Sequence, residues 1–216
     1  MIECVIFDLD GVIVDSEQVW DDVREELVRE RGGRWHEGAQ AAMMGMSSPE
    51  WSRYMHDVIG LPDPPERISE EVVERLAELY RRQLPLIDGA VEAVRRIGAR
   101  WPLGIASSSN RPLIDLFLEL TGTQKLFRAT VSSEEVAHGK PAPDVYLEAA
   151  ARLEVAPERC AAIEDSENGI RSASSAGMRV VAIPNRVFPP GPEALSLSAV
   201  VLDSLDELTP EAIEAG

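Results

Sequence analysis

The spacing of apolar residues changes along the chain. Residues 2–8 contain a short apolar run, "CVIF", that is typical of a buried strand. In residues 16–84 the apolar positions recur every three or four residues, and this spacing predicts helices at 17–31, 48–59 and 69–83. The breakers "RGG" and "LPDPPER" separate these helices. We therefore expect a helical block without strands after the first strand.

From Ile87 onward, short apolar runs alternate with helical patterns. Strands are expected in "PLGIASSS", "FRATVSS", "CAAIED", "MRVVAIP" and "AVVLD", and helices at 89–99, at 112–121, after "PAPD" and in "ENGIRSASSA". Such alternation is typical of a parallel sheet that is covered on both faces. We predict an α/β fold in which residues 1–15 and 85–216 form the core and residues 16–84 form an all-helical insert.

Composition and charge narrow the function classes. The chain has 216 residues, of which 44% are hydrophobic, and this suits one domain or a core with a smaller insert. The net charge of −17 is expected to repel a nucleic-acid backbone or an anionic membrane surface. The sequence has no apolar stretch of the roughly 18–20 residues that span a bilayer, and its acidic N-terminus differs from a signal peptide. We expect a cytoplasmic protein that binds neither nucleic acid nor membrane, with Cys4 and Cys160 as buried, reduced thiols.

Polar residues gather where the predicted strands end. In parallel sheets ligands bind beyond the carboxyl ends of the strands, and this edge is expected to bring together Asp8, Asp10, Ser107, Lys140, Glu164 and Asp165. Each has an ordinary alternative as a helix cap, a turn residue or, for Lys140, a surface cation. One cap needs only one carboxylate, however, which leaves the pair Asp8 and Asp10 unexplained. Lysine is also scarce, since 19 of the 21 basic residues are arginine, and this suggests that Lys140 supplies a compact ammonium group.

Four segments carry a family resemblance. The segments "DLDGVIVDSE", the serines of "GIASSS", "GKPAPDVY" and "IEDSENGIRSASSAGM" resemble, in this order, the four motifs of the haloacid dehalogenase superfamily of phosphotransferases. The helical insert follows the first motif, where a C1-type cap is inserted in that superfamily, and the chain resembles its beta-phosphoglucomutase-like phosphatases. The resemblance implies a Rossmann-like core with an inserted all-α cap, and a phosphatase that works through an aspartyl-phosphate.

The resemblance also implies chemical roles for the acidic residues. Asp8 would be the nucleophile, and Asp10 would be the general acid and base. Mg²⁺ would be held by the Asp8 carboxylate, the Asp10 backbone carbonyl and Asp165, with Glu164 assisting directly or through water. A set of oxygen donors without a plausible Cys or His ligand suits this hard cation.

The remaining core motifs would bind the phosphoryl group. The resemblance implies that Ser107, Ser108 and Lys140 contact its oxygens. Three carboxylates would then be balanced by Lys140 and Mg²⁺, provided that Asp10 is protonated at the outset. A site of this composition is roughly neutral before a phosphate dianion arrives.

The cap is expected to choose the substrate by closing over the site. Its candidate substrate residues are Gln18, Trp20, Met46, Ser47 and Arg53. Beta-phosphoglucomutases carry a histidine soon after the first motif and a cap arginine after a Gly-x-Ser turn, whereas the corresponding places here are Trp20 and Ser48. We therefore favour hydrolysis of a small phosphorylated metabolite, such as a sugar phosphate, over a mutase reaction.

Two other classes of protein use similar sets of residues. A haloacid dehalogenase would have no use for a Mg²⁺ site, and Asp10 and Asp165 argue against it. A non-enzymatic phospho-receiver also uses acidic residues, a hydroxyl and a lysine, but it is about half this length and lacks a helical insert. The sequence leaves open whether the protein is a monomer or a homodimer.

Overall fold

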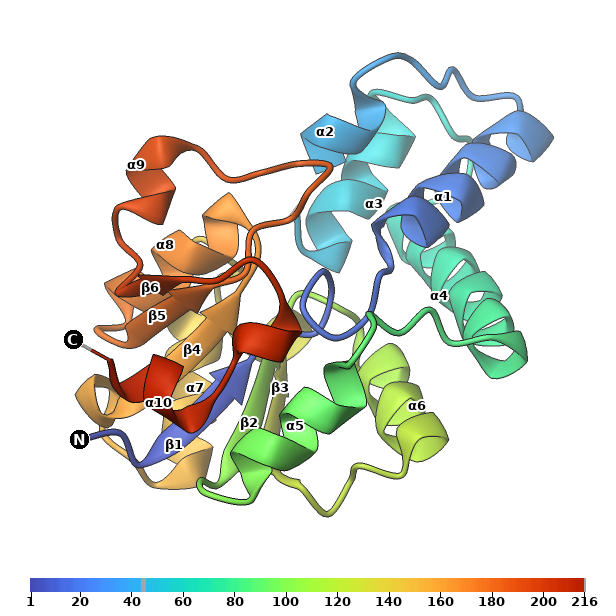
Figure 1. Cartoon of the computed structure of the whole chain (residues 1–216). Coiled ribbons are helices and arrows are strands. Elements are labelled where there is room, and N and C mark those ends of the chain that lie inside the picture. The colour runs from blue at the N-terminus through green and yellow to red at the C-terminus, as the bar shows by residue number, and fades with distance from the viewer. Residues whose placement is uncertain (44–45, 216) are drawn as a thin grey trace.

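A parallel sheet forms the centre of the structure, a computed structural model in which residues 1–43 and 46–215 are described (Figure 1). Within these residues the sheet has six strands in the order β3-β2-β1-β4-β5-β6, and every neighbouring pair is parallel. The strands are β1 (Cys4–Phe7), β2 (Leu103–Ser107), β3 (Phe127–Ser132), β4 (Cys160–Glu164), β5 (Arg179–Ala182) and β6 (Val200–Val201). The predicted α/β fold is thus confirmed.

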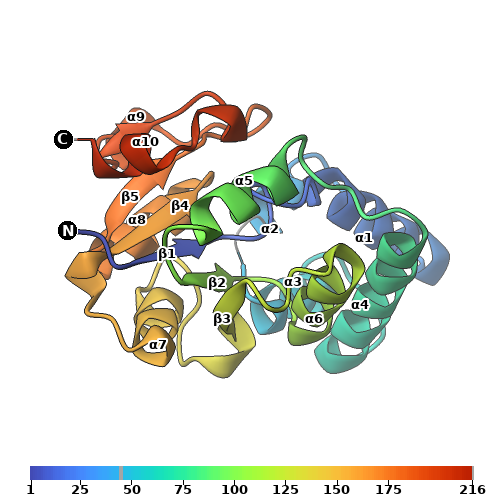
Figure 2. The same ribbon diagram turned by 60° about the horizontal axis from the view of Figure 1, so that its bottom comes forward.

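Helices cover both faces of this sheet, which explains why the central strands are apolar on both sides. Along β1, Val5 and Phe7 belong to one apolar cluster while Cys4 and Ile6 belong to the other, as the two-residue period of a strand requires. The first cluster includes α5 (Ala90–Gly98) and α6 (Arg111–Thr121), and the second includes α7 (Asp144–Leu153) and α8 (Glu167–Ser175). Figure 2 shows α5 and α7 on opposite sides of the sheet.

The first four of the five helices described between β1 and β2 form a separate layer beyond the carboxyl ends of the strands (Figure 1). They are α1 (Glu17–Arg31), α2 (Ala39–Met43), α3 (Ser48–Asp57) and α4 (Pro65–Arg82). The longest of them, α4, is amphipathic and buries Ile68, Val72, Leu76 and Tyr80, a spacing of four residues that keeps them on one face. It packs against α1 and α3, and also against α6 of the core. These packing contacts fix how the helical layer sits over the sheet edge.

Local signals account for the ends of these helices. Helix α1 ends at Gly32, which has a φ of 75° in the left-handed region that glycine adopts at little cost. Helix α3 begins with a capping box, in which the side chains of Ser47 and Glu50 each approach the backbone N–H group of the other residue. Helix α4 begins at Pro65, four residues before the predicted start, because proline is well suited to the first helical position.

The short helices were not predicted from the sequence. Helices α2, α9 (Pro192–Leu195) and α10 (Pro210–Glu214) span only one turn or little more, so they show no helical periodicity. Single turns of 3₁₀ helix occur at η1 (Ser133–Glu135), η2 (Pro157–Arg159) and η3 (Leu205–Glu207). In the described part of the chain, no helix is both long enough and apolar enough to cross a membrane.

The two cysteines face each other on the two central strands of the sheet. Cys4 on β1 is paired in register with Cys160 on β4, and both are buried, free thiols. The Cys4 thiol donates a hydrogen bond to Cys160 Sγ at 2.9 Å. They lie at the beginnings of their strands, at the edge opposite to the acidic cluster described next.

Candidate active site

The ends of β1 and β4 place three carboxylates side by side. Asp8 follows β1 directly, and its backbone N–H donates to the Ile163 carbonyl of β4 at 3.0 Å. Glu164 is the last residue of β4, and Asp165 follows it. One carboxylate oxygen from each of Asp8, Glu164 and Asp165 lies within 4.8 Å of the others, and all three residues are buried. The parallel register of β1 and β4 is therefore what gathers these acids.

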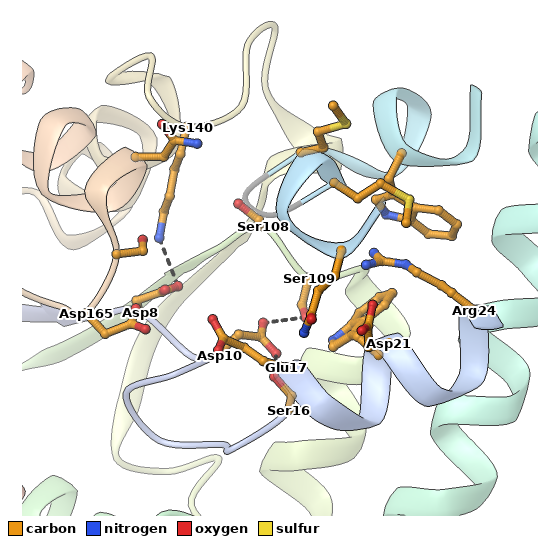
Figure 3. Close-up of a pocket in the computed structure, with 17 residues that line it drawn as sticks. Asp8, Asp10, Ser16, Glu17, Asp21, Arg24, Ser108, Ser109, Lys140 and Asp165 are labelled. Atoms are coloured by element: carbon orange, nitrogen blue, oxygen red, sulfur yellow. Dashed lines mark hydrogen bonds and ion pairs between the residues drawn. The ribbon is translucent and has the colours of Figure 1, made fainter. Parts of the chain in front are cut away.

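Lys140 reaches this cluster from the loop between β3 and α7. Its Nζ lies 2.9 Å from Asp8 Oδ1 and 2.6 Å from Glu164 Oε1, and the side chain is only 3% exposed. The same Glu164 oxygen accepts a hydrogen bond from the Tyr146 hydroxyl at 2.6 Å. Figure 3 shows the Lys140 side chain pointing at Asp8. Lys140 is thus a buried cation that is held between two carboxylates.

Even with Lys140 in place, the cluster carries an excess of negative charge. Burial raises the pKa of Asp8 to about 8; Lys140 opposes this shift, while the negative charges of Glu164 and Asp10 add to it. Burial, and then the charges of Glu164 and Asp8, raise the pKa of Asp165 well above its usual range. For Lys140, burial acts to lower the pKa, but Asp8 and Glu164 together outweigh it and hold that pKa above the ordinary value. A further cation would relieve this repulsion.

The residues present fit a divalent metal ion. Asp165 Oδ1 is buried and has no hydrogen-bond partner among the described residues, which is costly unless something else occupies it. The available donors are carboxylate oxygens, and these are the ligands that Mg²⁺ and Ca²⁺ prefer. The Glu164 oxygens, by contrast, already accept hydrogen bonds from Lys140, Tyr146 and the Asp165 backbone N–H.

Two glycines make room for the carboxylates. A Cβ atom on Gly11 would lie 2.0 Å from Asp165 Oδ2, and Gly11 also has a φ of +81°. A Cβ atom on Gly169 would lie 2.0 Å from Glu164 Oε1. Both separations are too short for any side chain, so the positions of Asp165 and Glu164 depend on glycine at these sites.

Asp10 is held by hydroxyl groups from two directions. Its Oδ1 accepts a hydrogen bond from Ser16 Oγ at 2.5 Å, and its Oδ2 accepts from Ser109 Oγ at 2.6 Å and from Ser107 Oγ at 3.3 Å. Ser107 is fully buried and also accepts from the Ser109 backbone N–H. The predicted Ser108 lines the pocket directly. Ser109 was not singled out in the sequence, although it directly follows the two predicted serines.

A pocket separates this cluster from the helical layer. Asp8, Asp10, Ser108, Ser109, Lys140 and Asp165 form its core side, together with Ser166 and Asn168. The opposite side consists of Ser16, Glu17, Trp20, Asp21, Arg24, Gln40, Met43, Met46 and Trp51. Figure 3 shows Asp8, Lys140 and Asp165 facing Asp21 and Arg24 across this space. A ligand bound here would contact core and insert together.

Of the five cap residues that were expected to contact substrate, two line the pocket. These two are Trp20 and Met46, and the other three lie outside the lining of the pocket. Gln18 donates a hydrogen bond to Asp22 on the surface, Ser47 caps α3, and Arg53 is exposed.

Helix α1 supplies three pocket residues that sequence reasoning missed, Glu17, Asp21 and Arg24, beside the predicted Trp20. Glu17, Trp20, Asp21 and Arg24 follow the spacing i, i+3, i+4 and i+7, which places them on one face of α1. This polar face, starting at the end of the first motif, was the available signal.

Hydrogen bonds join the helical layer to the core at two places. Ser48 Oγ on α3 donates to Asn110 Oδ1 at 2.9 Å, and both residues are buried. In addition, Asn185 Nδ2 donates to Glu17 Oε2 at 2.9 Å and lies 3.4 Å from Asp165 Oδ2. The structure therefore has the helical layer closed over the acidic cluster.

Comparisons with known proteins agree with this geometry. Residues 2–177 match the family described as haloacid dehalogenase-like hydrolase. The chain is 32% identical to hexitol phosphatase B of Escherichia coli over 212 residues, which cover 96% of this chain and 95% of that protein. Among solved structures, it is similar to CbbY from Rhodobacter sphaeroides in complex with phosphate, with a TM-score of 0.87 and 26% identity, covering 99% of this chain and 100% of the other.

A second solved structure is a beta-phosphoglucomutase from Clostridium difficile, with a TM-score of 0.85, 25% identity and coverage of 99% of this chain and 96% of the other. Together with the family match, which spans most of the chain, these similarities extend over the core and the helical layer alike. The chain therefore belongs to the haloacid dehalogenase-like hydrolases, in their beta-phosphoglucomutase-like subgroup, and is a phosphoric monoester hydrolase.

Proposed function

We propose that this hydrolase is a Mg²⁺-dependent phosphatase that removes the phosphate from a small polyhydroxylated metabolite, such as a sugar or sugar-alcohol phosphate. The observation that carries the proposal is the buried Asp8 carboxylate at the core side of the pocket. It is paired with Lys140 and lies beside Asp165, whose Oδ1 has no hydrogen-bond partner among the described residues. A nucleophile, a cation for the phosphoryl oxygens and a ligand for a metal ion are then within reach of one bound phosphate.

In the first chemical step an Asp8 oxygen attacks phosphorus, and the bond from phosphorus to the leaving alkoxide breaks. Asp10 gives its proton to that alkoxide, which leaves as an alcohol. In the second step Asp10 takes a proton from water, the water oxygen attacks phosphorus, and the bond to Asp8 breaks. The products are inorganic phosphate and the original carboxylate, so one hard displacement is replaced by two easier ones.

Phosphate binding is proposed for Lys140 and Ser108, which line the pocket. Ser107 lies behind them, where it orients Asp10 and the Ser109 backbone. Asp8 and Asp165 would hold Mg²⁺, with the Asp10 backbone carbonyl as a further ligand. When bound, Mg²⁺ would neutralise charge on the phosphoryl oxygens and offset the repulsion among the buried carboxylates.

Glu164 is proposed to act mainly by holding Lys140 in place, because its oxygens are already occupied by hydrogen bonds. Residues 16–84 are proposed to act as a cap that excludes water when it closes. Trp20 packs edge-on against Trp51, with ring centroids 5.9 Å apart, and offers no group for proton transfer. We therefore favour hydrolysis over a mutase reaction. The cytoplasmic location stays a prediction, and both a monomer and a homodimer agree with the sequence.

Phosphate release from a panel of phosphorylated metabolites tests this function. We expect activity that requires Mg²⁺, is lost with EDTA and returns on adding Mg²⁺. Asp8→Asn should reduce turnover by orders of magnitude, since it removes the nucleophile. Asp57→Asn, at an exposed position on α3, is the matched control and should retain full activity. Near-normal phosphate release by purified Asp8→Asn would refute the assignment, and isomer formation without phosphate release would indicate a mutase.

A further inference from the structure

Arg24 is a buried cation in the pocket wall that the chemistry above does not use. Its guanidinium carbon lies 4.7 Å from the ring centroids of both Trp20 and Trp51, and the residue is only 8% exposed. Nε is buried and has no hydrogen-bond partner in the described part of the chain. Among the same residues, no carboxylate forms an ion pair with the guanidinium at 4.0 Å or less.

Such an arrangement is costly for a protein with nothing bound. A buried charge without a hydrogen-bonding partner loses hydration that the two indole faces replace only in part. In keeping with this, burial lowers the pKa of Arg24 to about 10, although the charges of Asp21 and Asp10 act in the opposite direction. Packing alone would be served equally well by an apolar residue between two tryptophans.

Asp21 presents the complementary group on the same face of α1. Its Oδ1 is buried and also lacks a hydrogen-bond partner among the described residues, and burial raises the pKa of this carboxyl group. Both side chains line the pocket and face Asp8 and Lys140 across it (Figure 3). Within the described residues the wall therefore offers a buried donor, Arg24 Nε, and a buried acceptor, Asp21 Oδ1, that lack partners, and both could serve whatever extends from a phosphate bound at Asp8.

We infer that Arg24 and Asp21 determine specificity by binding hydroxyl groups on the carbon chain of the substrate, with the guanidinium donating to hydroxyl oxygens and the Asp21 carboxylate accepting hydroxyl protons. The inference rests on the proposed function and adds the recognition of the neutral end of its substrate. A hydroxyl group is both donor and acceptor, so neighbouring hydroxyls satisfy both side chains at once.

Charge on the wall argues against the main alternative, a second anionic group on the substrate. Glu17 and Asp21 are acidic and Arg24 is the basic residue on this part of α1, so the face carries a net charge of −1. A second phosphate or a carboxylate would satisfy Arg24 but would be repelled by the two carboxylates. Neutral hydroxyl groups avoid that repulsion.

Arg24→Met tests the inference, because methionine keeps an unbranched stem between the tryptophans and removes the donors. With hexitol 6-phosphate we expect kcat/KM to fall about 10- to 100-fold, because hydrogen bonds to a charged group are lost. With p-nitrophenyl phosphate, which has no hydroxyl chain, kcat/KM should change less than about twofold. Arg24→Lys should restore part of the loss. Equal losses with both substrates, or no loss with hexitol 6-phosphate, would overturn the inference.

Binding separates this inference from the proposed function. In an Asp8→Asn background, isothermal titration calorimetry should show that Arg24→Met weakens the binding of hexitol 6-phosphate by the factor expected for kcat/KM. This result does not depend on whether the wild-type protein releases phosphate. Hexitol 6-phosphate should also bind more tightly than the 6-phosphate of the corresponding aldonic acid, in which a carboxylate replaces the terminal CH₂OH. Tighter binding of the acid would show that the wall selects an anion. Thermal unfolding establishes that each variant is folded.

Discussion

Gly11→Ala tests whether the site depends on space that glycine leaves for Asp165. The substitution has two separable effects, because Gly11 has a φ of +81° and an added Cβ would lie 2.0 Å from Asp165 Oδ2. A left-handed conformation costs a residue with a Cβ about 1–2 kcal/mol. The clash adds a second consequence, since Asp165 must move away from the place where its oxygens meet those of Asp8 and Glu164.

Gly32→Ala is the matched control. Gly32 has a similar φ of +75°, but among the described residues no atom beyond its immediate chain neighbours lies within 4 Å of the position of its missing Cβ. Both variants should therefore lose about 1–2 kcal/mol of stability, which for a domain of this size corresponds to a fall in Tm of about 2–8 °C. Only Gly11→Ala should disturb the metal site.

Thermal unfolding with and without Mg²⁺ distinguishes the two effects. At a Mg²⁺ concentration about 100 times Kd, binding should stabilise the wild-type protein and Gly32→Ala by about 2.7 kcal/mol, or about 5–11 °C in Tm. In Gly11→Ala this gain should disappear together with phosphatase activity. If Gly11→Ala keeps both the Mg²⁺-dependent rise in Tm and its activity, the reasoning about Asp165 is wrong.

Two further substitutions test the cation and the closure of the pocket. Lys140→Met leaves Asp8 and Glu164 without the cation that they share. We therefore expect the free energy of unfolding, measured with urea, to fall by about 3–5 kcal/mol, and turnover to be lost. Lys125→Met, at an exposed position, should change neither quantity. Ser48→Ala removes the donor to the buried Asn110 carbonyl oxygen, which should disfavour the closed form by about 1–3 kcal/mol and raise KM more than it lowers kcat. A steady-state KM equal to that of the wild-type protein would contradict a role of this hydrogen bond in closure.

Most strands and the longer helices follow from local sequence signals. Strand β1 and helix α1 lie where the apolar pattern predicts them, with α1 at Glu17–Arg31 as expected. The acids at the ends of β1 and β4 meet because strand ends in a parallel sheet share one edge, and the resemblance of four ordered motifs implies a common site for them. The positions of Asp8, Glu164 and Asp165 could therefore be anticipated without knowing any side-chain contact.

The pocket wall could not be anticipated in the same way. Helical periodicity shows that Trp20, Asp21 and Arg24 share a face of α1, but not whether that face meets the core, the solvent or another helix. Ser47 and Arg53 illustrate the limit, since one caps α3 and the other faces solvent. Side chains on an inserted layer acquire their surroundings only when that layer docks.

The sequence by itself determined the succession of strands and longer helices along the chain, the acidic edge of the sheet and the family. The tertiary structure decided which side of the inserted helices faces that edge of the sheet. The physical reason is that strand ends are placed by backbone hydrogen bonding within the sheet, whereas the insert is placed by the packing of α4 against α1, α3 and α6. Only that packing brings Trp51 of α3 over Arg24 of α1 and buries the guanidinium opposite Asp8.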